Sequence, residues 1–100
     1  MSPFIWNDKK NKRLIKDRKV SFDEVVSSIE KGQVLDLIEN PNAEKYRGQW
    51  VLVMEIRKYA YPVPFEQRGD KIFLITVIPS RKMTRKYLLL KNGGGNGQTQ

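Results

Sequence analysis

Three apolar stretches between Trp50 and Ile78, separated by very short links, constrain the fold more than any other feature of this sequence. Trp50 to Ile56 and Tyr59 to Glu66 show the alternation that is typical of β-strands, and Lys71 to Ile78 is apolar on both faces. Links this short favour antiparallel hairpins. We therefore expect an antiparallel sheet in which Lys71 to Ile78 is a central strand covered on both faces.

Two features of this region depart from regular strand pairing. Pro62 and Pro64 remove two backbone donors, so the second strand should be irregular or pair on only one side. The link Arg57-Lys58 lacks the Gly or Asn that a two-residue hairpin turn prefers. It is the weakest point of the hairpin prediction.

The N-terminal region predicts a highly charged surface helix. Asn7 suits an N-cap, and Asp8 follows it at the positive end of the helix dipole. The helix should run from Asp8 to about Asp17. Its apolar stripe is thin, chiefly Leu14 and Ile15, so we expect it to lie on the surface.

A second helix has the clearest local signal in the chain. Ser21 and Glu24 form a capping box, in which the Ser hydroxyl accepts from the N3 amide and Glu24 reaches back. Gly32 marks the end of the helix. Apolar residues at helical spacing give it one buried face: Phe22, Val25, Val26 and Ile29.

These elements together predict an α+β fold. Phe4-Ile5-Trp6 can open a sheet, Val34 to Ile38 reads as a further short strand, and Ser80 can cap a short helix over 81–89. We expect two N-terminal helices packed on a small antiparallel sheet of about four strands, with a short C-terminal helix. Residues 1–91 should form one domain, and the Gly-rich tail 92–100 should be disordered.

The positive charge is concentrated at the two ends of the chain. Residues 1–20 hold seven basic and two acidic side chains, and residues 71–100 hold six basic and none acidic. The intervening residues 21–70 hold six basic and nine acidic side chains. This distribution favours a charged surface patch that binds an acidic partner, and RNA is the partner we expect. A merely solvated cationic surface is the simpler alternative.

Cysteine and histidine are both absent from the sequence. Their absence removes disulfides, the usual Cys/His zinc sites and a cysteine nucleophile, so no metal or cofactor is expected. No apolar run has the length of a membrane span or of a signal sequence. We expect a cytoplasmic protein that does not contact a membrane.

The segment Arg81 to Lys86 conflicts with helix rules. On a helix, Arg81 and Arg85 form a like-charge i,i+4 pair, as do Lys82 and Lys86, and cations in the first turn oppose the dipole. Such conflicts are expected where function outweighs folding. The alternative is a solvated end helix whose aliphatic stems cover the sheet.

Five aromatic residues are candidates for stacking on RNA bases: Tyr46, Trp50, Tyr59, Tyr61 and Tyr87. The strand alternation favours core positions for Trp50 and Tyr59. One or two of the tyrosines are expected to be exposed, and Tyr61 is our candidate among them.

The order of these features resembles a known family. Phe4-x-Trp6-Asn7, then Lys10, then Val20-Ser21-Phe22-x-Glu24 is similar to the opening of BrnT-type toxins, which usually reads F-x-W-D-x-x-K and then K-H-G-V-S-F-x-E. Residues 77–85 (VIPSRKMTR) resemble the family's I-I-S-A-R-K-A-T-R. The resemblance spans roughly residues 4–90. Arg18-Lys19 stands where the family has His-Gly, and Asn7 replaces the usual Asp.

This resemblance implies a RelE-like fold and a toxin of a bacterial type II toxin–antitoxin pair. The implied activity is ribosome-independent, metal-independent RNA cleavage, neutralised by a cognate antitoxin, for which we expect a ribbon-helix-helix protein. DNA would then be contacted only through the antitoxin. By position, Lys10, Arg81 and Arg85 match basic residues of the family pattern.

Metal-independent RNA cleavage uses the 2′-OH as nucleophile and needs a proton acceptor and cations. Arg81 and Arg85 suit charge stabilisation on phosphate. Without histidine, the acceptor would be a lysine that gives up its proton among clustered cations, Lys10 or Lys82, or a carboxylate such as Glu66. The residues expected to bind RNA are Lys9, Arg13, Arg18, Lys19, Lys86 and Tyr61.

Two other functions compete with the nuclease. A non-catalytic module would use the same basic surface to hold RNA or an acidic antitoxin-like partner, and the missing histidine favours it. A DNA-binding regulator is less consistent with the sequence. The exposed face of the second helix carries Asp23, Glu24 and Glu30, which repel phosphate.

Overall fold

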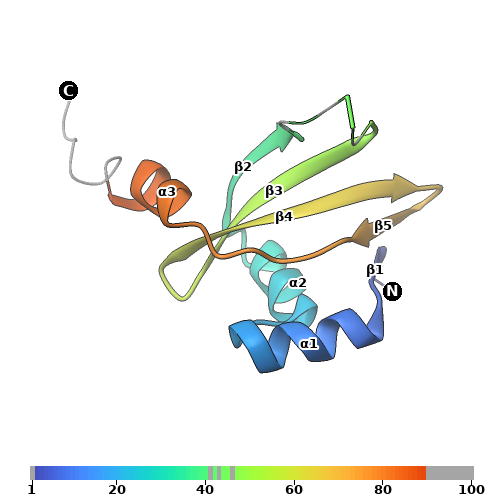
Figure 1. The fold of residues 1–100 in the computed structure, drawn as a ribbon, viewed down its shortest axis with the longest axis horizontal. Helices are drawn as coiled ribbons and strands as arrows, with labels where there is room; N and C mark the ends of the chain where they lie inside the picture. Colours follow the sequence, from blue (N-terminus) through green and yellow to red (C-terminus); the bar gives the residue numbers. More distant parts are fainter. Residues whose placement is uncertain (1, 41, 43, 46, 90–100) are drawn as a thin grey trace.

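The computed structural model describes residues 2–40, 42, 44–45 and 47–89. In this part of the chain a five-stranded sheet carries helices on both faces, so the expected α+β class is confirmed (Figure 1). The expected tail, 92–100, and the end of the expected domain, 90–91, lie outside the described residues. In chain order the elements are β1 (Phe4–Ile5), α1 (Asp8–Arg18), α2 (Phe22–Glu30), β2 (Val34–Glu39), β3 (Gln49–Ile56), β4 (Tyr59–Arg68), β5 (Lys71–Leu74), α3 (Arg81–Thr84) and the π-helical turn η1 (Arg85–Leu89).

Both N-terminal helices begin at the predicted caps. The Asn7 side chain accepts from the Lys10 amide at 2.9 Å, and the Ser21 hydroxyl accepts from the Glu24 amide at 3.1 Å. The Glu24 carboxylate forms an ion pair with Arg57 and does not complete the expected bond back to Ser21. Among the described residues, no helix is both long enough and apolar enough to cross a membrane.

The sheet differs from the expected four antiparallel strands in number and direction. Its order is β1-β5-β4-β3-β2, and β1 runs parallel to β5 with Phe4 beside Ile72. The other neighbours are antiparallel. The sequence placed a possible strand at Phe4-Ile5-Trp6, but a strand of two residues carries too little alternation to specify its partner or its parallel direction.

Strand β5 ends at Leu74 and is not the central strand that the apolar run to Ile78 predicted; β4 is central. The two prolines of β4 explain the short pairing. The carbonyls of Pro62 and Pro64 accept from the amides of Ile78 (3.1 Å) and Ile75 (2.9 Å). Neither proline has an N–H to return the bond, so no ladder forms there. As expected, β4 pairs along most of its length with β3 alone.

The β3–β4 turn adopts the backbone that its sequence disfavours. Arg57 and Lys58 have φ values of 52° and 63°, the positive values that a two-residue turn of matching twist requires. For residues other than Gly or Asn, this left-handed backbone costs roughly 1–2 kcal/mol of conformational energy per residue. Arg57 is held there by contacts of its guanidinium with Glu24 and with the Lys19 carbonyl.

Two apolar clusters occupy the two faces of the sheet. Helices α1 and α2 pack on one face, where Leu14 and Phe22 meet Met54 and other strand residues. Met83, Tyr87 and Leu88 of α3 and η1 pack with Val53 and Ala60 on the opposite face (Figure 1). The C-terminal helix is therefore not part of the same layer as the N-terminal pair.

Candidate nucleic-acid interface

Hydrogen bonds fix helix α3 to the central strand. The Ser80 hydroxyl caps it by accepting from the Met83 amide at 3.1 Å. The buried Thr84 hydroxyl accepts from the Ala60 amide at 2.9 Å and donates to the Ser80 carbonyl at 2.7 Å. The bond to Thr84 satisfies the Ala60 amide of β4, which has no partner on β5 because the pairing of β4 with β5 does not extend to residue 60. The start of α3 is thereby held in a fixed position on β4.

The anchored helix presents three cations on the surface. Arg81, Lys82 and Arg85 are exposed and line one open hollow of about 360 Å³. None of the three forms an ion pair with a carboxylate of the described chain, where Arg57–Glu24 and Arg68–Glu66 are the pairs formed. The structure thus brings together three of the four residues that the sequence assigned to catalysis.

The following turn is tied to β2 through a tyrosine. The Tyr87 hydroxyl donates to the Asp36 carboxylate at 2.5 Å, across the packed face of the sheet. This hydrogen bond, with burial and the charge of Asp36, raises the pKa of Tyr87. The exposed Lys86 has its ammonium 5.1 Å from the centre of the Tyr87 ring, within the range of a cation–π contact.

Tyr87→Phe is expected to lower the free energy of unfolding by about 1–2 kcal/mol, because Asp36 loses a hydrogen bond to its charged carboxylate. Since the pKa of Tyr87 is raised in the fold, the stability it contributes is present below pH ~10 and is lost as the pH rises through the folded pKa. Urea unfolding at pH 7 and at alkaline pH measures both effects. If the variant matches the wild type at pH 7, the Tyr87–Asp36 bond does not stabilise the fold.

The basic residues of α1 lie on a different surface. Lys10, Arg13 and Arg18 line a hollow of about 40 Å³ together with Leu14 and Asp17. The remaining two predicted RNA-binding residues of this region, Lys9 and Lys19, are exposed. Lys10 thus belongs to a separate hollow from Arg81, and α1 packs on the opposite face of the sheet from α3.

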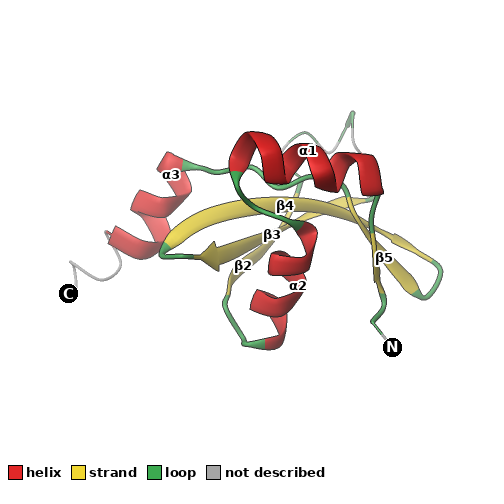
Figure 2. Ribbon diagram, turned by 90° about the horizontal axis from the view of Figure 1, so that it is seen from below, coloured by secondary structure: helices red, strands yellow, loops and turns green. Residues whose placement is uncertain are grey.

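Helix α1 runs along the sheet, so that its C-terminal end lies toward α3 and its start lies near β5 (Figure 2). The Arg18 guanidinium donates to the carbonyl of Val77 at 2.6 Å, on the segment that leads into α3. The β3–β4 turn extends to the same end, and Lys58 shares a hollow with Leu88 and Leu89 of η1. Positive charge from the C-terminal end of α1, the turn and α3 therefore borders one end of the molecule.

The aromatic residues are distributed differently from the sequence predictions. Tyr61 is 8% exposed and packs edge-on against Tyr59 in the core, so it has no free ring face for a base. Tyr59 is half-buried against the same core, as expected. Trp50, assigned to the core, is 43% exposed because α1 and α2 do not reach that end of β3. Tyr46 lies outside the described residues.

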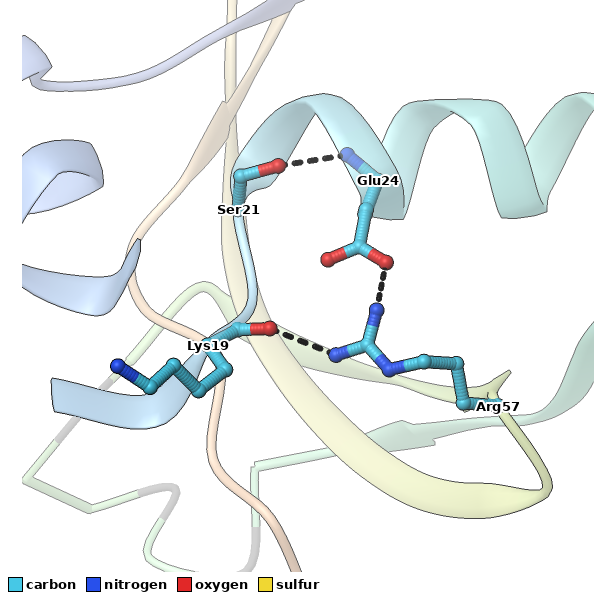
Figure 3. A network of polar contacts seen from close by, with 4 residues as sticks. All are labelled: Lys19, Ser21, Glu24 and Arg57. Atoms are coloured by element: carbon cyan, nitrogen blue, oxygen red, sulfur yellow. Dashed lines mark hydrogen bonds and ion pairs between the residues drawn. The ribbon is translucent and has the colours of Figure 1, made fainter. Parts of the chain in front are cut away.

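The sequence did not identify a cluster around Arg57. Its guanidinium contacts the carboxylate of Glu24 and, at 2.7 Å, the carbonyl of Lys19 (Figure 3). One sequence feature could have pointed to this cluster: the link Arg57-Lys58 lacks the Gly or Asn that its turn prefers. Glu66, the carboxylate that the sequence offered as a proton acceptor, forms an ion pair with Arg68 at 2.5 Å.

Neither a metal site nor a comparison with known proteins assigns a function to these surfaces. In the part of the chain that the structure describes, no three His, Cys, Asp or Glu side chains gather to hold a metal ion. No family model, curated protein or solved structure matches the chain.

Proposed function

We propose that this protein is the toxin of a type II toxin–antitoxin pair, which acts in the cytoplasm as a metal-independent endoribonuclease. The observation that carries the proposal is the group of three exposed cations, Arg81, Lys82 and Arg85, in one open hollow without a carboxylate partner in the described chain. Unpaired guanidinium groups are suited to bidentate contact with phosphate. Segment 77–85 is also the part that resembles the closing motif of BrnT-type toxins.

Arg81 and Arg85 would stabilise the charge that develops on the phosphate during attack by the 2′-OH. Lys82 adds positive charge to the same hollow. The α1 cations of the second hollow, Lys10, Arg13 and Arg18, extend the attraction along the RNA backbone. The expected partner is a cognate antitoxin, for which we propose a ribbon-helix-helix protein that covers this surface.

A non-catalytic binding module is the second candidate, and one observation favours it. The described residues that line this hollow are Arg81, Lys82 and Arg85, and none of them is a carboxylate or another side chain that is ordinarily unprotonated at neutral pH. Such a site would hold RNA or an acidic protein segment without cutting anything.

Incubating the purified protein with end-labelled RNA in the presence of EDTA distinguishes these functions. The nuclease is expected to produce new 2′,3′-cyclic phosphate ends, and its RNA affinity should fall steeply between 50 mM and 200 mM salt, because phosphate contacts displace counterions. Salt-sensitive binding without new ends would support the binding module. RNA binding that does not respond to salt would contradict both.

A further inference from the structure

In the described chain, the non-glycine residues with a left-handed backbone all lie at one place. They are Lys19, which ends α1 with φ 57°, and Arg57 and Lys58 in the β3–β4 turn. The two segments are joined directly, because the Arg57 guanidinium donates to the Lys19 carbonyl. All three are cations, at positions where glycine or asparagine would be less strained. Because such strain gathers at functional sites, the charge at this place calls for a functional explanation.

A carboxylate lies at the centre of this cluster. Glu24 binds one end of the Arg57 guanidinium, while the Ser21 hydroxyl holds the Glu24 amide at the start of α2 (Figure 3). The Arg57 and Glu24 side chains remain 51% and 37% exposed, so a ligand can reach both. The Lys19 ammonium points away from the pair. The accessible unit is thus a guanidinium and a carboxylate held side by side.

Glu24 also separates two surface hollows. One, of about 410 Å³, has apolar walls from Ile15 and Val20 beside Lys19. The other, of about 280 Å³, is polar and is lined by the hydroxyls of Ser27 and Ser28 and by the cations Lys31 and Arg57. An apolar wall suits a base and a cationic, hydroxyl-lined wall suits a phosphate. The two hollows together therefore fit one nucleotide step of an RNA strand.

Other carboxylates that line a hollow have less suitable surroundings. Asp17 lies in a hollow of about 40 Å³, which has room for water but not for a nucleotide. Glu55 lines a hollow with Lys58 and two leucines, without an arginine. Of these three carboxylates, Glu24 is the one that pairs an arginine with space for a nucleotide.

We propose that Glu24 is the proton acceptor of RNA cleavage and that Arg57 stabilises the phosphate it acts on. This inference rests on the proposed nuclease function. It supplies the reaction with a carboxylate as general base in a protein that has no histidine. In this refinement of the proposed function, Arg57 takes over the contact with the attacked phosphate. Arg81, Lys82 and Arg85, which line a separate hollow, then hold other phosphates of the strand. Lys19 and Lys58 add positive charge on the two sides of the Arg57 turn.

The reaction is a transesterification that needs no further reactant. The Glu24 carboxylate takes the proton of the 2′-OH as the 2′-oxygen forms its bond to phosphorus. The bond from phosphorus to the 5′-oxygen breaks, and the leaving oxygen takes a proton from solvent water. Protonated Glu24 then returns its proton to the hydroxide that remains. The products are a 2′,3′-cyclic phosphate and a 5′-hydroxyl.

The test replaces Glu24 by alanine and measures cleavage and binding of the same labelled RNA. Loss of acid–base help should lower the cleavage rate about 10²–10⁴-fold, while RNA affinity should not fall, because a negative charge has been removed. Added formate should restore part of the rate, as it can occupy the vacated position and accept the proton. Glu30→Ala, an exposed carboxylate on the same helix, should cleave at the wild-type rate.

Each result decides the proposal. Since Glu24→Ala also removes the ion pair with Arg57, Glu24→Gln provides the test if the alanine variant does not fold. A folded Glu24 variant that cleaves like the wild type would overturn the inference and leave the proposed nuclease intact. Loss of cleavage that formate does not restore, with RNA binding lost in parallel, would identify Glu24 as a structural residue. Absence of cleavage by the wild type would overturn both proposals.

Discussion

Replacing Arg81 by alanine is expected to abolish growth arrest when the protein is expressed without a partner. Under the proposed function, in which Arg81 contacts the attacked phosphate, the same change should lower RNA cleavage by about 10²–10³-fold, the usual loss when one preorganised donor to a developing oxyanion is removed. The fold should persist, because Arg81 is exposed and α3 is anchored by Ser80 and Thr84. Growth curves, RNA cleavage and thermal unfolding measure the three effects.

Two matched variants separate the geometry of Arg81 from its charge. Lys12→Ala removes one positive charge from an exposed position of α1 and should leave cleavage nearly unchanged. Arg81→Lys keeps the charge but loses the planar fork, so it should recover only part of the activity. A folded Arg81→Ala protein that arrests growth as well as the wild type would show that this hollow is not the functional site.

Phe22→Ala is expected to lower the free energy of unfolding by about 3–5 kcal/mol, a large share of the stability of a domain of this size. Phe22 is fully buried, its ring stacks on Trp6 with 5.6 Å between centroids, and its amide donates to the Asn11 side chain at 2.8 Å. The substitution would leave a cavity where α1, α2 and the sheet meet. Urea unfolding followed by tryptophan fluorescence is the measurement.

Leu37→Ala provides the comparison for this stability prediction. Leu37 is 53% exposed on β2, so its truncation should change stability by no more than about 0.5 kcal/mol. Equal losses in the two variants would contradict the assignment of Phe22 to the centre of the core.

The features that could be predicted from the sequence are those that depend on neighbouring residues. Asn7 and Ser21 cap their helices through side-chain contacts with amides three positions ahead. The same locality explains the short helix after Ser80 and the pairing of β3 with β4 across a two-residue turn. Capping and alternation are encoded within a few residues, so they can be identified before any tertiary contact is known.

The features that escaped prediction depend on contacts between distant segments. The strand at Phe4 finds its partner at Ile72, and the apolar run beyond Leu74 loses its ladder because of Pro62 and Pro64 on the neighbouring strand. Trp50 alternates like a core residue but lies beyond the reach of the helices. In each case the deciding contact lies on another element.

The candidate site was partly predictable for the same reason. Arg81, Lys82 and Arg85 are close in sequence and share a hollow in the structure. Glu24 and Arg57, by contrast, come together only when the β3–β4 turn reaches the start of α2. The sequence showed that Arg57-Lys58 is an unfavourable turn. The contacts that hold Arg57 there, with Glu24 and with the Lys19 carbonyl, are seen only in the structure.

The parallel pairing of β1 with β5 has a consequence for biosynthesis. The first strand leaves the ribosome early but has no partner until Lys71–Leu74 has also emerged. Sheets closed by contacts between distant residues form late and slowly. A nascent chain would therefore lack its complete sheet until residues 71–74 have left the ribosome, and during that interval the apolar face of the sheet would be open to contact with other molecules.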